Sequence, residues 1–139
     1  MTATPPSRSA TPLAKKLGAK PGMTVQLLHA DAGWRIPPDG LPDDLTWLPD
    51  GDDSPADLIV AFFRATADLL AELDALGPRI HPAGMLWLAW PRKAAGRLSD
   101  LSDSVVRAAG LDRGLVDVKV AALDQDWSSL KFVWRLTSR

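Results

Sequence analysis

The sequence predicts a single α/β domain whose mostly parallel sheet ends in an antiparallel hairpin. Two nearly all-apolar runs, DLIVAFF at residues 57–63 and MLWLAW at 85–90, are separated by a helical pattern. Strands of a parallel sheet that is covered on both faces have this composition. The chain then ends in two alternating segments, residues 115–123 and 129–136, which are typical of a hairpin. We therefore expect three layers, with the sheet in the middle.

The first half of the chain adds a short helix and two further strands. LAKKL lies between Thr11-Pro12, which suits a helix start, and Gly18, which suits a helix stop. MTVQLLHA at residues 23–30 predicts a strand, and residues 46–48 predict a very short one. The intervening GWRIPPDGLPDDL is mostly turn-forming. Residues 1–10 are polar and Pro-rich, so we expect a disordered tail before a domain at residues 11–139.

Two amphipathic helices follow the apolar strands. The first is expected to end at Gly77-Pro78, and its amphipathic pattern, with a spacing of three or four, is set by Phe62, Thr66, Leu69, Leu70, Leu73 and Leu76. The second is expected to be capped by Ser99 or Asp100 and closed by Gly110. Its inner stripe is Leu101, Val105, Ala108 and Ala109.

The alternation in the terminal hairpin predicts one buried and one partly wet face. The buried face is expected to carry Val116, Val118, Val120 and Ala122 on one strand, and Leu130, Phe132, Trp134 and Leu136 on the other. Opposite charges that face each other across a ladder stabilise it by about a few tenths of a kcal/mol. We therefore expect Asp117 opposite Arg135, which leaves Lys119 opposite Val133.

Composition excludes several classes of function. The chain has 139 residues and no cysteine, which removes disulfides, thiolate metal sites and cysteine nucleophiles. No apolar run approaches the ~20 residues of a membrane helix, and the start lacks a signal-peptide core. These features predict a soluble cytoplasmic protein that does not enter a membrane. A net charge of −1 disfavours nucleic acid as a partner.

An aspartate-rich segment does not have the pattern of a metal site. Seven aspartates and no Lys or Arg lie between residues 39 and 57. A calcium loop that starts at Asp50 would need glycine at its sixth position and glutamate at its twelfth. Pro55 and Ala61 stand there. We expect a solvated loop, no metal and no cofactor.

The order of elements resembles the methyltransferase-type variant of the doubly wound, Rossmann-like fold. In that variant the final antiparallel strand inserts beside its predecessor. The resemblance spans about residues 20–136 and lacks one strand–helix unit, so the fold looks truncated. It implies a fold more strongly than an activity.

The cofactor motif of that fold argues against methyl transfer. Such methyltransferases follow their first strand with a glycine-rich turn, so that the backbone approaches the cofactor closely. Here the turn reads LLHADAGW, with His29 and Asp31 at the first two glycine places and only Gly33 remaining. Side chains there would collide with a closely held ligand. No clear acidic residue ends a second strand to hold a ribose.

A second resemblance covers almost the whole chain after residue 12. The string LAKKLGAKPGM…GMLWLAWPRK…GLVDVKVAALDQDWSSLKF is similar to a family of small bacterial proteins that is classified only as a domain of unknown function. The match is most specific from residue 114 to residue 132. It implies a shared fold and no particular activity.

A ligand site is expected at the edge where the parallel strands end. The topology places the WPRK turn and the tip of the terminal hairpin side by side at that edge. The candidate ligand-binding residues are Arg92, Lys93, Ser99, Asp124, Trp127, Ser128, His29 and Asp31. No catalytic constellation is indicated.

Two interpretations of this edge stay open. In the first, Arg92 and Lys93 bind an anion at the N-terminus of the helix that starts at Ser99 or Asp100, where the dipole favours negative charge. Trp127 then supplies a stacking face and Asp124 an acceptor. In the second, Lys93 pairs with Asp124 or Asp126, and Trp127 is a packed plug.

The leading hypothesis is a non-catalytic, methyltransferase-like module with a binding or regulatory role. The alternative is a small enzyme or binder for a phosphorylated or carboxylated metabolite at the carboxyl edge of the sheet. An anionic small molecule is therefore one expected partner. A second copy of the chain, which would pair through the outer face of the hairpin, is another.

Overall fold

In a computed structural model that describes residues 11–92 and 99–138, six strands form one sheet in the order β2-β1-β3-β4-β6-β5. β1 pairs in parallel with β2 and β3, and β3 pairs in parallel with β4. β6 is antiparallel to both of its neighbours. The strands are β1 (Thr24–Leu28), β2 (Thr46–Leu48), β3 (Leu58–Phe62), β4 (Met85–Pro91), β5 (Leu115–Ala122) and β6 (Trp127–Trp134). The predicted α/β class and the insertion of the last strand beside its predecessor are confirmed.

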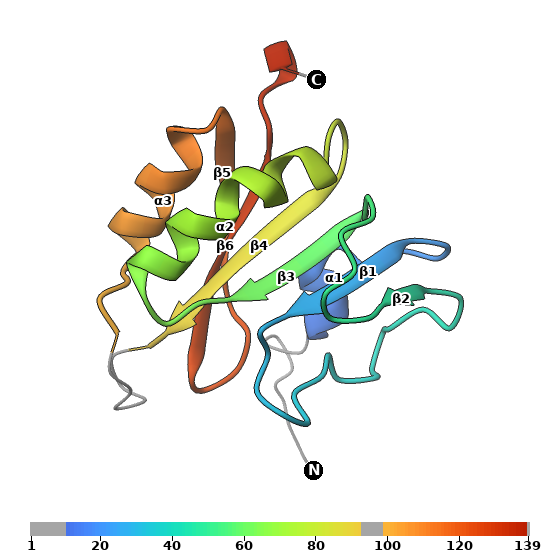
Figure 1. The fold of residues 1–139 in the computed structure, drawn as a ribbon. Coiled ribbons are helices and arrows are strands. Elements are labelled where there is room, and N and C mark those ends of the chain that lie inside the picture. Colours follow the sequence, from blue (N-terminus) through green and yellow to red (C-terminus); the bar gives the residue numbers. More distant parts are fainter. Residues whose placement is uncertain (1–10, 93–98, 139) are drawn as a thin grey trace.

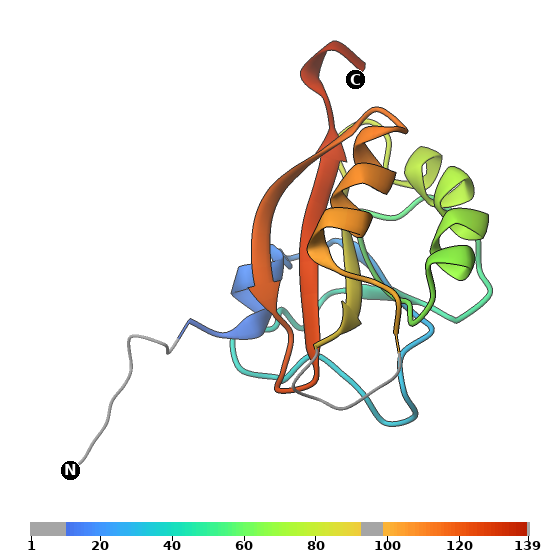
Figure 2. The same cartoon turned by 90° about the vertical axis from the view of Figure 1, so that its left-hand side faces the viewer.

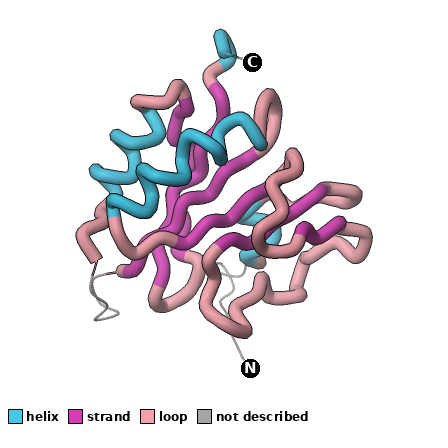
Figure 3. Tube along the Cα trace, in the orientation of Figure 1, coloured by secondary structure: helices cyan, strands magenta, loops and turns pink. Residues whose placement is uncertain are grey.

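The sheet lies between two unequal layers (Figures 1 and 2). One face is covered by α2 (Thr66–Arg79) and α3 (Asp103–Leu111), and the other by the short α1 (Leu13–Leu17). The connection from β1 to β2 has no helix, as the tube drawing makes clear (Figure 3). Its Ile36 packs on the same face as α1. A short 3-10 helix, η3 (Leu136–Ser138), follows β6.

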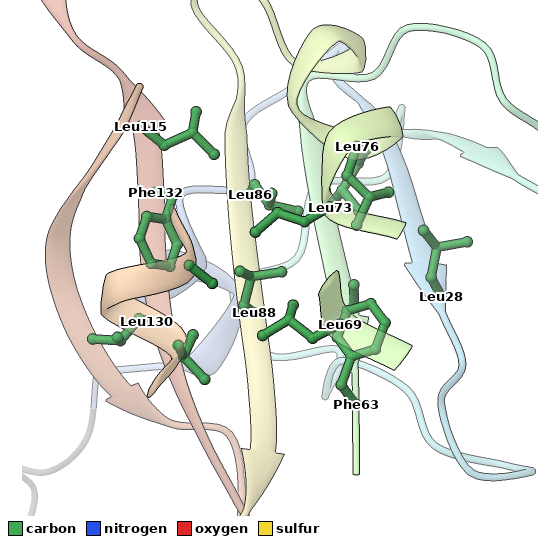
Figure 4. Packing of buried hydrophobic residues seen from close by; sticks show 14 of the residues in the cluster. Leu28, Phe63, Leu69, Leu73, Leu76, Leu86, Leu88, Leu115, Leu130 and Phe132 are labelled. Atoms are coloured by element: carbon green, nitrogen blue, oxygen red, sulfur yellow. The ribbon is translucent and has the colours of Figure 1, made fainter. Parts of the chain in front are cut away.

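The core under α2 and α3 consists of leucine, isoleucine and aromatic side chains. Leu69, Leu73 and Leu76 of α2 lie over Leu86 and Leu88 of β4, and Phe132 and Leu130 continue the layer under α3 (Figure 4). All of these side chains are buried. At about 25 cal/mol per Å² of apolar surface, this burial is the main stabilising contribution on this face.

The core on the α1 face is built around aromatic rings. Phe62, Trp87 and Trp127 are buried there together with Leu17 of α1. A five-residue helix is too short to be stable by itself, so tertiary contacts must hold α1. The indole Nε1 of Trp87 donates to the backbone oxygen of Leu17 at 3.0 Å. Gly18 ends α1 at φ 86°, in the left-handed region that suits glycine.

The predicted strands and the short first helix are confirmed, mostly with ends shifted by one or two residues. The very short strand at residues 46–48 is confirmed as β2. Pro91, expected to stop the fourth strand, is its last residue and pairs with Trp127. The predicted tail at residues 1–10 lies outside the described residues. No helix in the described part of the chain is long and apolar enough to cross a membrane.

The predicted ends of both longer helices are wrong. α2 continues past Gly77 and contains Pro78, and Leu70 on it is exposed. Gly77 allows a close approach: a Cβ there would lie 3.3 Å from Cζ2 of Trp134, whose Nε1 donates to the Gly77 oxygen.

The N-cap of α3 lies two or three residues later than expected. Its N-cap is Ser102, whose Oγ accepts from the Val105 N–H. The inner stripe shifts accordingly to Val106, Ala109 and Gly110, while Ala108 is exposed. Gly110 lies inside the helix because Phe132 occupies the space next to it. Sequence patterns do not reveal such neighbours from distant strands.

The predicted register of the hairpin is also wrong. Asp117 pairs with Phe132, and Lys119 pairs with Lys131. An irregularity between Asp117 and Lys119 inserts Val118 into β5 and shifts the alternation. Val118 and Val120 are therefore 53% and 63% exposed, although the sequence predicted them to be buried. Asp117 instead accepts from Nε of Arg107 on α3 at 2.8 Å.

Candidate functional site

The candidate site lies where β1 and β3 end, at the switch point of the sheet. The chain leaves β1 toward β2 on one side and leaves β3 toward β4 on the other. Open α/β sheets bind ligands in the crevice at such a point. Here a cavity of about 280 Å³ is lined by His29, Phe62, Phe63, Arg64, Asp68 and Glu72. This volume is just below the roughly 300–1,000 Å³ typical of ligand pockets.

His29 closes one side of this crevice. It directly follows β1 and has a φ of 61°, in the left-handed region that non-glycine residues rarely adopt. Its Nε2 lies 2.8 Å from Oε1 of Glu72 on α2. Its ring also meets the edge of Phe63, with centroids 5.6 Å apart. The turn after β1 is thus tied by a side chain to the helix after β3.

Arg64 closes the other side. Its Nη2 donates to Oδ1 of Asp31, which links the end of β3 to the turn after β1. The guanidinium carbon also lies 4.8 Å from the ring centroid of Trp127, in a cation–π contact. Two side-chain bridges, His29–Glu72 and Arg64–Asp31, therefore span the switch point.

The tip of the terminal hairpin lies at this same edge, as expected. Pro91 pairs with Trp127, and the backbone N–H of Arg92 donates to the oxygen of Asp126 at 2.8 Å. Oδ1 of Asp124 accepts from the backbone N–H groups of Asp126 and Trp127, which shapes the turn. Oδ2 of Asp124 accepts from Nε1 of Trp34 at 2.9 Å.

Aromatic packing joins the hairpin tip to the crevice. The ring of Phe62 makes edge contacts with Trp34 and with Trp127, at centroid distances of 4.8 and 5.0 Å. Trp127 is only 1% exposed, which agrees with the packed-plug interpretation rather than with an open stacking face. Asp124 and Asp31 are likewise engaged by protein groups.

The other predicted site residues lie farther along the same edge. Arg92 follows β4 and is exposed. Ser128 pairs with Trp90 and helps to line a separate cavity of about 370 Å³ between β4, β6 and the start of α3. Lys93, the centre of the anion-binding interpretation, lies outside the described residues.

The helix start predicted for anion binding is not at Ser99 or Asp100. Ser99 Oγ accepts from the Leu101 N–H before α3 begins. Asp100 instead caps α2 from a distance, because its Oδ1 accepts from the Thr66 N–H at 2.7 Å. This hydrogen bond lowers the pKa of Asp100. The positive end of α2 is therefore already matched by a carboxylate of the chain itself.

Sequence reasoning missed two acidic residues of the crevice, Asp68 and Glu72. They stand one helical turn apart on α2, so they share a face of that helix. That spacing was visible in the sequence, but the partner His29 lies 43 positions away. Asp50 and Asp52 shortly follow β2 and line a neighbouring cavity of about 220 Å³ together with His29. Within the described ranges no group of three or more residues could hold a metal ion.

Comparisons with known proteins support the fold alone. No family model matches the chain, and no curated protein matches its sequence. A SAM-dependent methyltransferase from Aquifex aeolicus superposes with a TM-score of 0.60 at 17% identity, over 86% of each chain. The magnesium protoporphyrin IX methyltransferase of Synechocystis PCC 6803 with bound SAH gives 0.59 at 12% identity, over 83% of this chain and 75% of that one.

A third solved structure widens the range of chemistry found on similar folds. A protein described as a pericyclic reaction enzyme matches with a TM-score of 0.51 at 11% identity, over 97% of this chain and 50% of that one. The chain therefore has a methyltransferase-like fold. At these identities the likeness does not carry an activity.

Proposed function

We propose that this protein is a non-catalytic, methyltransferase-like module with a binding or regulatory role. The observation that carries the proposal is the pair of side-chain bridges across the switch point. His29–Glu72 and Arg64–Asp31 join the ends of β1 and β3 where a ligand of such a fold would approach the backbone. The chain's own side chains fill that position.

The turn after β1 does not suit a cofactor held closely against the backbone. Close approach requires glycine, because any Cβ projects into the space that the ligand needs. This turn carries His29 and Asp31 in the glycine places, and both side chains are bonded across the crevice. The space that remains, about 280 Å³, suits only a small ligand.

The anionic-metabolite alternative has less support. Asp100 caps the α2 N-terminus, Asp124 is used by the hairpin turn, and Trp127 is buried. Within the described residues, the carboxyl edge of the sheet thus directs most of its polar groups at other parts of the protein. No specific observation favours a metabolite phosphate at this edge.

The direct test is methyl transfer with a labelled donor. Purified protein incubated with labelled S-adenosylmethionine and candidate acceptors should give no transfer, and calorimetry should detect no binding of the donor or of S-adenosylhomocysteine. Methylated product above the no-enzyme background would overturn the proposal.

A variant that opens the crevice sharpens this test. The double change His29→Gly and Glu72→Gln removes one bridge and the Cβ at the first glycine place. Donor binding that appears in this variant but not in the wild type would support closure by side chains. Asp74→Asn is the matched control, because Asp74 lies on the same helix but pairs with Arg113. It should leave donor binding unchanged.

A further inference from the structure

The lysines that the structure describes are concentrated on α1, just after it, and on the two strands at one edge of the sheet. The sequence has six lysines, and five lie in the described residues. Lys15 and Lys16 belong to α1, and Lys20 follows it closely. The other two are Lys119 on β5 and Lys131 on β6.

Three elements bring some of these lysines together. Lys131 pairs with Trp87 across β4 and β6, so both side chains lie on the α1 face. Lys119 pairs with Lys131 across β5 and β6, so it shares that face. The Nζ of Lys119 donates to the backbone oxygen of Lys16 at 3.4 Å, which brings β5 against α1.

Within the described residues, no carboxylate neutralises the charges of these lysines. Burial lowers the pKa of Lys131, and the charges of Lys119 and Lys20 lower it further. In the part of the chain that the structure describes, no salt bridge joins any of the five lysines to a carboxylate. Asp43 and Asp44, in the loop before β2, make none with them either.

Structural roles explain only part of this arrangement. A lysine on an edge strand such as β5 discourages pairing with other chains, and Lys119 also meets a carbonyl at the C-terminal end of α1. Neither role requires a second, partly buried lysine directly opposite. Like charges that face each other across a ladder destabilise it. Lys131 therefore lacks a structural explanation.

We propose that Lys119 and Lys131, which face each other across β5 and β6, form a binding site for a phosphate group on the α1 face. A phosphate carries about −1.5 to −2 charges and three acceptor oxygens, so it can accept from several ammonium groups at once. A single carboxylate offers one charge and two oxygens. Lysine binds phosphate as a point charge and needs no fixed fork geometry. The site is separate from the β1/β3 crevice. The proposal therefore does not depend on the function proposed above.

Calorimetry with inorganic phosphate and with pyrophosphate tests the site. The wild type should bind both, more tightly at low salt. Lys119→Gln and Lys131→Gln should each weaken binding by about tenfold or more, the loss expected for one charge-assisted hydrogen bond. Lys15→Gln is the matched control, because Lys15 lies next to Gly40 and is not among the charges that lower the pKa of Lys131. It should change the affinity less than about twofold.

Two further measurements keep the outcome clear. Thermal unfolding must stay cooperative in each variant, and the side-chain signals of Lys131 followed by NMR against pH should titrate at a higher pH when phosphate is present. An oligo-aspartate peptide tests the competing carboxylate chemistry. No binding of phosphate at millimolar concentration, equal binding in Lys131→Gln, or tighter binding of the peptide would overturn the proposal.

Discussion

The two faces of the sheet differ in whether their charged side chains are paired with opposite charges. On the α2/α3 face, arginines pair with carboxylates: Arg107 lies 2.8 Å from Asp117, and Arg113 lies 2.8 Å from Asp74. On the α1 face, lysines face one another across β5 and β6. The first face is thick, with two helices over a leucine core, whereas the second is covered by five helical residues and irregular chain.

This difference separates what stabilises the protein from what remains available to a partner. Paired charges over a closed core contribute to the fold and leave little for a ligand to gain. Repulsion within an unneutralised cluster destabilises the folded protein slightly. Binding of an anion would relieve that repulsion. The predictions below test this contrast, from the largest expected effect to the smallest.

Gly110→Ala should destabilise the α2/α3 face most. The added Cβ would lie 2.6 Å from Cδ1 and 2.8 Å from Cζ of Phe132, and overpacking of this kind costs about 1–3 kcal/mol. Glycine to alanine inside an unhindered helix would instead stabilise by about 1 kcal/mol. The sign of the change in the free energy of unfolding, measured in urea, therefore distinguishes overpacking against Phe132 from the gain in helix propensity. A stabilised variant would mean that α3 does not pack against β6 as described.

Trp87→Phe should weaken the attachment of α1 to the sheet, and Trp134→Phe should weaken that of α2 on the opposite face. Trp87 donates to the Leu17 oxygen of α1, and Trp134 donates to the Gly77 oxygen of α2, both at 3.0 Å. Each change removes a hydrogen bond to the oxygen of a buried residue, and a buried acceptor left without a partner costs about 1–3 kcal/mol. Hydrogen exchange should then speed up in α1 for Trp87→Phe and in the last turn of α2 for Trp134→Phe. The same pattern in both variants would contradict independent attachment of the two layers.

Lys119→Gln should stabilise the protein slightly. It removes one of two like charges that face each other across β5 and β6, a gain of about 0.2–1 kcal/mol. The gain should shrink as salt is added, because these side chains are partly solvated. Lys15→Gln serves as the control and should change the free energy of unfolding less. A clear loss of stability in Lys119→Gln would show that its contact with the Lys16 oxygen outweighs the repulsion.

The pH dependence of the free energy of unfolding should arise from an attractive pair on the α2/α3 face and from a partly buried, repelled charge on the α1 face. The hydrogen bond from Arg107 lowers the pKa of Asp117 below 3.8, so its contribution is present above that value and is lost as pH falls through the folded-state pKa. The pKa of Lys131 is also lowered, from 10.5, so the unfolded chain binds more protons in the window just below 10.5. Stability should rise with pH there.

Urea unfolding in acid and in alkali checks both signs. Asp117→Asn should flatten only the acid limb, and Lys131→Gln only the alkaline one. If either change altered the other limb, or neither limb, the assignment of these groups would be wrong.

Much of the fold could be predicted from local patterns. The seven buried residues of β4 form a continuous apolar run, and the helical segment between two such runs indicated parallel strands. The place of the last strand beside its predecessor came from the resemblance to the methyltransferase-type fold. The meeting of residues 90–92 with the hairpin tip followed from topology and is confirmed by the pairing of Pro91 with Trp127. The predicted extent of the first strand was enough to place His29 and Asp31 at or just beyond its end.

The details that set the site could not be predicted in this way. Ser99, Asp100 and Ser102 are all good helix caps, and only packing assigns Asp100 to α2 and Ser102 to α3. The irregularity at Val118 leaves no mark in an alternating sequence, yet it turns Lys119 toward Lys131. The bridge from His29 to Glu72 depends on how α2 crosses the end of β1.

The sequence by itself determined the class of fold, the side chains in the turn after β1 and the lack of any cysteine chemistry, because these depend on composition and on periods of two to four residues. The tertiary structure alone decided which charges are neutralised. Charge pairing acts through space between residues that are distant in the chain, and a shift of one residue in register or helix phase changes every partner. The side-chain bridges across the crevice and the lysine cluster both depend on this register and on the position of α2.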